Sequence, residues 1–116
     1  MTTIEPLSRT AAAPPTPLRL TLTRPSPHTV VVGVAGELDA CSAPRLCELV
    51  LARLRGTLRA VVVDLSEVDF LDAAAVSGLA RASLLARHRG IAFRIIPGRN
   101  PCVTRALEIV GLPSER

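Results

Sequence analysis

One stretch of the chain restricts its fold more than any other: RAVVVDL, residues 59–65, is almost continuously apolar and rich in β-branched side chains. A strand that is apolar on both faces is typical of a parallel sheet with helices on both sides. Parallel neighbours are joined by a crossover connection, usually a helix. The stretch therefore predicts an α/β fold in which strands and helices alternate.

Patterns of both kinds do alternate along the chain. LRLTLT, residues 18–23, reads as a half-buried strand, and the prolines of RPSPH predict a turn into a second strand, residues 28–39. The later elements are expected as a helix over 42–56, the strand 59–65, a helix over 72–89, a strand over 91–96 and a helix over 100–110. This order predicts a mostly parallel four-stranded sheet with an antiparallel edge strand, packed with three to four helices.

The chain is expected to form one domain. Its 116 residues, 48% of them hydrophobic, supply one compact core and are too few for two ordinary domains. Residues 1–17 combine proline, threonine and alanine without periodicity, which predicts a flexible N-terminal extension. Residues 18–116 are then the folded domain.

Composition argues against a nucleic-acid or membrane protein. All 14 basic residues are arginine and they are scattered, which predicts a solvated surface and no nucleic-acid patch. Phe70 and Phe93 are the only aromatic residues, so surfaces for base stacking are few. No apolar run reaches the roughly 18 residues of a membrane-spanning helix, and no signal peptide is visible. We expect a cytoplasmic protein without membrane insertion.

Three cysteines, Cys41, Cys47 and Cys102, form no metal or disulfide pattern. Their number is odd, no two make a CxxC pair, and His28 and His88 lie far from them in sequence, which argues against zinc and against a disulfide framework. Cys47 falls within a helical pattern and is expected to be a small buried hydrophobe. Cys41 and Cys102 lie near helix starts, where thiol pKa values can fall, so redox control is an alternative for them.

The carboxyl ends of the parallel strands should form the functional edge of this sheet. Three segments follow those ends: residues 36–42, 66–77 and 97–102. In the second segment, Ala73, Ala74 and Ala75 begin a helix and supply no reactive group. Alanine favours helices and close packing, but such a flat helix end also suits docking of another protein. Ser77 has no base placed to activate it, so we do not expect a nucleophile there.

Carboxylates near this edge are candidates for chemistry that also have a structural explanation. Asp39, Asp64, Asp69 and Asp72 could converge there and hold Mg²⁺ for phosphoryl transfer. Asp39 and Asp72 precede helix starts, however, where a carboxylate caps free N–H groups, and Ser42 is likewise expected as an N-cap. The chain offers no lysine, no glycine-rich phosphate loop and no histidine at this edge. We therefore expect no enzymatic activity, no metal and no cofactor.

Three motifs carry a family resemblance: GELDACSAP at residues 36–44, VVVDLSEVDFLDAAAVSGL at residues 61–79 and PGRNPCVTRALEIVGL at residues 97–112. Together they resemble the STAS domain, specifically that of the bacterial anti-sigma factor antagonists. The resemblance runs from about residue 18 to residue 112, and the expected order of elements matches the family fold. It implies that residues 18–116 form a single STAS domain.

The resemblance implies a mechanism of partner switching. An antagonist of this family binds an anti-sigma factor of the GHKL-type ATPase fold, which is also a serine kinase, and so releases a sigma factor. The kinase phosphorylates a serine in a motif of the form Asp-Ser-Ser-Gly-Leu-Gly, and the added charge breaks the docked interface. The partner surface implied here comprises Asp39, Ser42, Asp72, Ala73, Ala74, Ala75, Val76 and Ser77.

The phosphoacceptor of that motif is missing from this chain. An ungapped alignment sets the motif on Asp72-Ala73-Ala74-Ala75-Val76-Ser77. The phosphoacceptor position is then Ala74, a degenerate site without a hydroxyl, and the resemblance implies an antagonist that phosphorylation does not switch. Aligning Ser77 with the family's serine instead would move the hydroxyl by about one helical turn and set Ala75 at the aspartate position.

Other STAS roles give two alternatives. A cytoplasmic STAS protein also docks on the nucleotide-binding subunit of ABC-type lipid transport ATPases. Some STAS domains bind small ligands or nucleotides, although nothing in this sequence beyond the generic edge indicates such a site. The sequence leaves open which sigma and anti-sigma factors are involved, what replaces phosphorylation as control, and whether the chain forms a weak homodimer.

Overall fold

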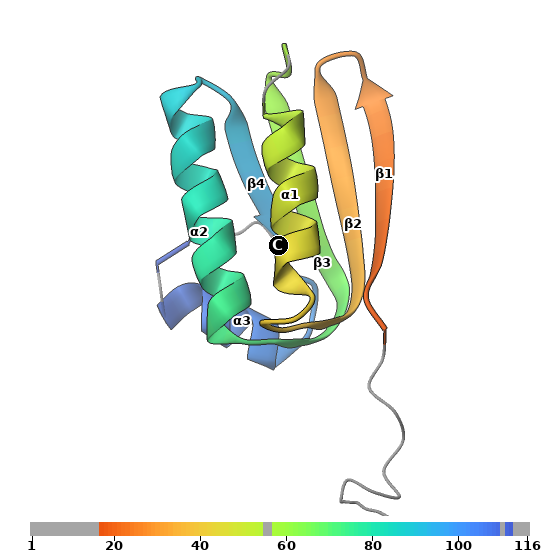
Figure 1. Ribbon diagram of the computed structural model, residues 1–116, viewed down its shortest axis with the longest axis vertical. Coiled ribbons are helices and arrows are strands. Elements are labelled where there is room, and N and C mark those ends of the chain that lie inside the picture. The colour runs from red at the N-terminus through yellow and green to blue at the C-terminus, as the bar shows by residue number, and fades with distance from the viewer. Residues whose placement is uncertain (1–16, 55–56, 110, 113–116) are drawn as a thin grey trace, which may run out of the picture.

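The computed structural model describes residues 17–54, 57–109 and 111–112. Its elements (Figure 1) are β1 (Arg19–Ser26), β2 (Thr29–Leu38), α1 (Ala43–Arg53), β3 (Ala60–Leu71), α2 (Ala73–His88), β4 (Ala92–Ile96) and α3 (Pro101–Ile109). The predicted order of strands and helices is confirmed. The predicted extension, residues 1–17, lies outside the described residues except for its last residue.

The four strands form one mixed sheet in the order β1-β2-β3-β4. Strand β1 pairs antiparallel with β2, whereas β2, β3 and β4 are parallel. Figure 1 shows β1 at one edge of the sheet and the crossover helices α1 and α2 side by side on one face. This is the expected α/β architecture, with three helices within the described part of the chain.

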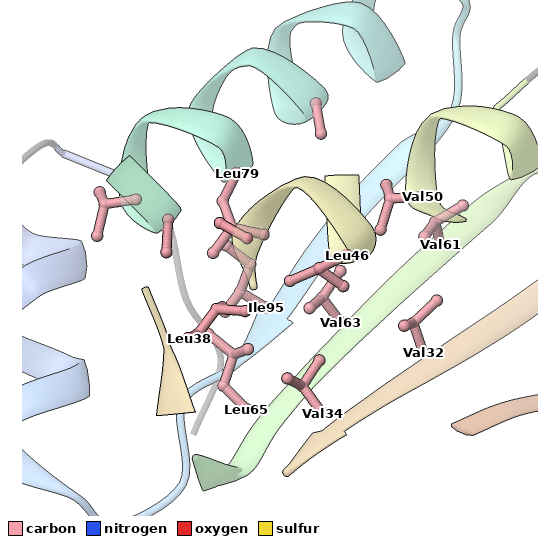
Figure 2. Packing of buried hydrophobic residues seen from close by; sticks show 14 of the residues in the cluster. Val32, Val34, Leu38, Leu46, Val50, Val61, Val63, Leu65, Leu79 and Ile95 are labelled. Carbon is pink, nitrogen blue, oxygen red and sulfur yellow. The ribbon is translucent and has the colours of Figure 1, made fainter. Parts of the chain in front are cut away.

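The side chains beneath α1 and α2 form the core of the domain. Every second residue of β2 is buried, and β3 alternates in the same way over its first half. The strand residues that line this core are Val30, Val32, Val34, Leu38, Val61, Val63, Leu65, Val68, Leu71 and Ile95. Figure 2 shows most of them beside Leu46 and Val50 of α1 and Leu79 of α2. Aliphatic side chains fill this space because the chain has only two aromatic residues.

The second face of β3 is less covered than its apolar run predicts. Val62 of β3 and its neighbour Val31 of β2 are half-buried, whereas the residues on the core face are buried. The prediction that helices cover both faces of this strand is wrong, because both crossover helices pack on the same face (Figure 1).

Two element boundaries differ from those expected. Strand β1 continues through Pro25 to Ser26, so the turn is made by Pro27 and His28 alone. Strand β3 continues to Leu71, well beyond the apolar run that ends at residue 65. Register shifts interrupt the pairing of β2 with β3, so the second half of β3 loses the alternation by which strands are recognised.

Helix α2 packs closely on α1 because its buried face is made of small residues. Ala75, Gly78 and Ala82 are all buried there. A Cβ atom added to Gly78 would collide with the sulfur of Cys47 on α1. Burial raises the pKa of this half-buried thiol, while the charge of Arg81 acts in the opposite direction. Close packing thus accounts for part of the alanine content of α2.

Candidate functional site

Asp72 joins two of the segments that the sequence places at the functional edge. Its carboxylate accepts a hydrogen bond from the N–H of Ala75 at 3.0 Å, which caps α2, and another from the N–H of Ala40 at 3.1 Å. Its own N–H donates to the carbonyl oxygen of Leu38 at 3.1 Å. The loop after β2 and the start of α2 are therefore held together at the lower end of the molecule in Figure 1.

Asp39 organises the loop between β2 and α1. Its Oδ1 accepts hydrogen bonds from the N–H of Cys41 at 2.9 Å and of Ser42 at 3.0 Å, and it lies 3.0 Å from the Ser42 hydroxyl. That hydroxyl also lies 2.9 Å from the carbonyl oxygen of Glu37. Ser42 is the N-cap residue of α1, but its side chain makes no capping bond, because its hydroxyl points back into the loop.

Hydrogen bonds to the ionised carboxylate hold the pKa of Asp39 below its ordinary value. The largest contributions come from the backbone and the hydroxyl of Ser42, and desolvation acts in the opposite direction. Because the folded pKa is depressed, this interaction stabilises the fold above the ordinary pKa of aspartate. The stabilisation is lost as pH falls through the folded pKa.

This sign predicts how the Asp39→Asn variant responds to acid. The wild type should be the more stable protein near neutral pH, and the difference in free energy of unfolding should shrink as pH falls from about 5 to about 2. Urea titrations at a series of pH values measure the difference, with substitution of the exposed Glu108 of α3, Glu108→Gln, as the control. A difference that stays constant over this range would show that the ionised carboxylate does not hold the loop.

The exposed side chains over the first five residues of α2 carry only methyl and hydroxyl groups. Ala73, Ala74 and Ser77 are exposed and share one face of the helix. Ala75 and Val76 are buried, at 1% and 3% exposure, and pack into the core. The structure therefore leaves Ala73, Ala74 and Ser77 as the members of the α2 start whose side chains are open to a partner.

Phe70 is a surface residue that sequence reasoning missed. It lies near the end of β3, opposite Glu37 of β2, and its side chain is 47% exposed, although phenylalanine is usually buried. Aromatic side chains are enriched at protein interfaces. The sequence did offer one indication of this exposure: Phe70 comes two residues before Asp72, next in sequence to a helix start made of small side chains.

The remaining predicted carboxylates, Asp64 and Asp69, play local structural parts. The carboxylate of Asp64 accepts hydrogen bonds from the N–H and the hydroxyl of Ser66 within β3. Asp69 uses its backbone carbonyl, which accepts from the side-chain amide of Asn100 at 3.1 Å and so ties the start of α3 to β3. Within residues 17–54, 57–109 and 111–112, no three His, Cys, Asp or Glu side chains could share a metal ion.

Two further findings concern the thiols and the helices. Cys41 and Cys102 are exposed free thiols at the starts of α1 and α3. In the described part of the chain, no helix combines the length and the apolar character needed to cross a bilayer.

Comparison with known proteins gives a family match and several similar solved structures. A protein-family model described as "Mlab, STAS domain" matches residues 21–113. An anti-sigma factor antagonist from Mycobacterium paratuberculosis is 24% identical with a TM-score of 0.72, covering 89% of each chain. Phosphorylated SpoIIAA from Bacillus is 14% identical with a TM-score of 0.68, covering 84% of this chain and 92% of that one. An anti-sigma factor antagonist STAS domain from Rhodobacter sphaeroides is 26% identical with a TM-score of 0.52, covering 70% of this chain and 85% of that one. A search of curated proteins finds no match.

Proposed function

The chain belongs to the STAS-domain family described as Mlab, and from this premise we propose that it is an anti-sigma factor antagonist that phosphorylation does not switch off. The observation that carries the proposal is an exposed, nearly featureless helix start, which an exposed phenylalanine, Phe70, precedes by three residues in the chain. We call this region the docking surface; it consists of Asp39, Ser42, Phe70, Asp72, Ala73, Ala74 and Ser77.

The cap on α2 supports the alignment that sets the phosphoacceptor position at Ala74. Asp72 accepts the capping hydrogen bond from the first turn, which is a role that the family's aspartate can fill at this helix start. The alternative alignment assigns the aspartate position to Ala75, which is buried. Ala74 is exposed, so a serine in its place would face a docked kinase, whereas alanine keeps the shape and lacks the acceptor oxygen.

The groups of the docking surface suit binding better than catalysis. Phe70 and the methyl groups of Ala73 and Ala74 supply apolar area that a partner can cover. The carboxylates of Asp39 and Asp72 already accept hydrogen bonds from backbone N–H groups, so they shape the two loops. We infer a cytoplasmic, non-enzymatic protein that needs no cofactor and whose partner is an anti-sigma factor with the GHKL-type kinase fold.

The family description favours a second candidate function. The matching family carries the name Mlab, which supports a STAS subunit of an ABC-type lipid transport ATPase as the alternative. Such a subunit would dock on the nucleotide-binding subunit of the transporter. The identity of the protein that binds the docking surface separates the two candidates.

Titration of the purified full chain tests both functions. The chain is titrated by calorimetry with each GHKL-type anti-sigma factor and each ABC nucleotide-binding subunit encoded in its genome. Binding to an anti-sigma factor that frees a sigma factor from it supports the antagonist. Binding to a nucleotide-binding subunit alone supports the transport role and contradicts the antagonist. Sedimentation of the free chain at the same concentrations measures the proposed weak homodimer.

A further inference from the structure

A groove of about 310 Å³ runs along β2 on the face of the sheet opposite α1 and α2. Gly33 and Ala35 alternate with the buried Val32 and Val34 of the core, so they lie on this other face. We call it the open face, because both crossover helices pack on the core face (Figure 1). The residues that line the groove include Arg19 and Thr21 of β1, Gly33 and Ala35 of β2, and Asp64 and Glu67 of β3.

The floor of the groove is low because β2 carries small residues there. Gly33 pairs with Thr21, and a Cβ atom added to Gly33 would collide with the hydroxyl oxygen of Thr21. Ala35 continues the floor toward the carboxyl end of β2. Toward the amino end, the half-buried Val31 and Val62 pair side by side on the same face. The open face therefore offers apolar area to which another surface can come close.

Charges of opposite sign flank the groove in one row across the sheet. Ala35 pairs with Arg19 of β1 on one side and with Glu67 of β3 on the other. Given the spacing of strands, the Cα atoms of Arg19 and Glu67 lie about 10 Å apart. Both side chains are exposed, and neither has an ion-pair partner within the described part of the chain. The open face thus presents a cation and an anion on opposite sides of β2.

A second copy of the open face complements this arrangement of charges. In a two-fold symmetric interface the same surface meets itself, so each contact between two different residues occurs twice. A two-fold axis roughly along β2 lays β1 of one copy over β3 of the other, as in the aligned packing of two sheets. Arg19 of each copy then lies over Glu67 of the other, because both residues are in register with Ala35. The small residues of β2 meet on the axis and allow close approach.

The size of the open face predicts a weak dimer. Thr29, Val31, Gly33 and Ala35 mark its rows from one end of β2 toward the other. Three strands over these rows give a flat area of about 400 Å² per copy, or about 800 Å² in total. Stable interfaces bury roughly 1,200–2,000 Å² in total, and solvent-accessible ion pairs add little. Association is therefore expected only at high concentration of the chain.

From the groove and the opposite charges beside it, we propose that the open face binds the open face of a second copy, with Arg19 of each copy paired with Glu67 of the other. The second copy is the occupant because this one surface supplies both members of the ion pair. The inference gives the weak homodimer an interface. It does not rest on the antagonist role, because no residue of the docking surface lines the groove.

Sedimentation equilibrium of the full chain over a range of concentrations tests this interface. The wild type should show a reversible equilibrium between monomer and dimer. Arg19→Glu and Glu67→Arg should each raise the dimer Kd about tenfold, because each replaces two attractive pairs with two repulsive ones. The double variant Arg19→Glu/Glu67→Arg restores opposite charges in both pairs, so its Kd should return to within about twofold of the wild-type value.

Two control variants make the same changes of charge on the other face of the sheet. Arg45 and Glu48 are exposed on α1, which packs on the core face. Arg45→Glu and Glu48→Arg should each dimerise as the wild type does. Nuclear magnetic resonance of the ¹⁵N-labelled wild type adds a second measurement: the amide resonances of Gly33 and Ala35 should shift as the concentration rises.

Several outcomes would overturn the proposal. A wild type that stays monomeric at every concentration would refute it, and a dimer that both single variants leave unchanged would use another surface. Weakening by the single variants without restoration in the double variant would show that Arg19 and Glu67 do not face each other. Equal weakening by the controls on α1 would reduce the effect to net charge. If a variant does not fold, the resonances decide: shifts confined to α1 and α2 would place the interface on the core face.

Discussion

Ala74→Glu is expected to weaken binding of the partner protein by roughly 100-fold or more, with no change in fold. Ala74 is exposed on the first turn of α2, two residues after the carboxylate of Asp72. A glutamate covered by a partner at this position would be a buried, uncompensated charge, which costs about 3 kcal/mol or more. The change is measured by titrating the partner with wild type and variant.

A matched substitution on the same helix separates this effect from a general effect of charge. Leu84 is 56% exposed and lies about 15 Å farther along α2, given the rise per residue of a helix. Leu84→Glu should bind the partner with wild-type affinity. Equal affinity of wild type and Ala74→Glu, with identical circular dichroism spectra, would place the interface elsewhere.

The second large effect is expected from Gly98→Ala, which should destabilise the fold by about 2–5 kcal/mol. Gly98 has φ +74°, and a Cβ atom there would lie 2.6 Å from the Cα of Ser66 on β3. The backbone of one of these segments would have to move. Urea denaturation of wild type and variant measures the loss of stability.

Gly90→Ala is the control for this substitution. Gly90 has a similar φ of +69°, but an added Cβ would meet no atom within 4 Å. Gly90→Ala should therefore lower the free energy of unfolding only by the cost of a left-handed backbone conformation, about 1–2 kcal/mol. If both variants lose the same stability, the close approach of Gly98 to Ser66 contributes nothing to the fold.

The order of elements was predictable because it depends on local patterns. The apolar run of β3 and the helix starts at Asp72 and Asn100 are all readable from neighbouring residues. The extension of β3 to Leu71 was not predicted, because register shifts against β2 remove the alternation from that part of the strand. The exposure of Phe70 was missed for the same reason.

The hydrogen bonds and burial around the proposed docking surface were predictable only in part. The hydrogen bond from Ala40 to Asp72 joins residues 32 positions apart, so no local pattern reveals it. The burial of Ala75 and Val76 had a usable signal, since they precede the buried Leu79 by four and three residues and so lie on its face of the helix. Counting residues along the helix would thus have predicted that Ala75 and Val76 are buried and that only the other α2 residues of the implied partner surface are exposed.

Phosphorylation by the proposed partner, an anti-sigma kinase, tests the central claim most directly. Wild type, Ala73→Ser and Ala74→Ser are each incubated with this kinase and ATP, phosphate is located by mass spectrometry, and the affinity of each product is measured. We predict that the wild type accepts no phosphate, whereas Ala74→Ser is phosphorylated and then loses affinity. Phosphorylation of Ala73→Ser instead would shift the alignment by one residue.

The contradicting result is equally specific. Robust phosphorylation of the wild type at Ser77 would show that the switch moved along α2 by about one turn and was not lost. Failure of the kinase to modify Ala74→Ser, although it binds that variant tightly, would show that residue 74 does not reach the active site of the kinase in the complex.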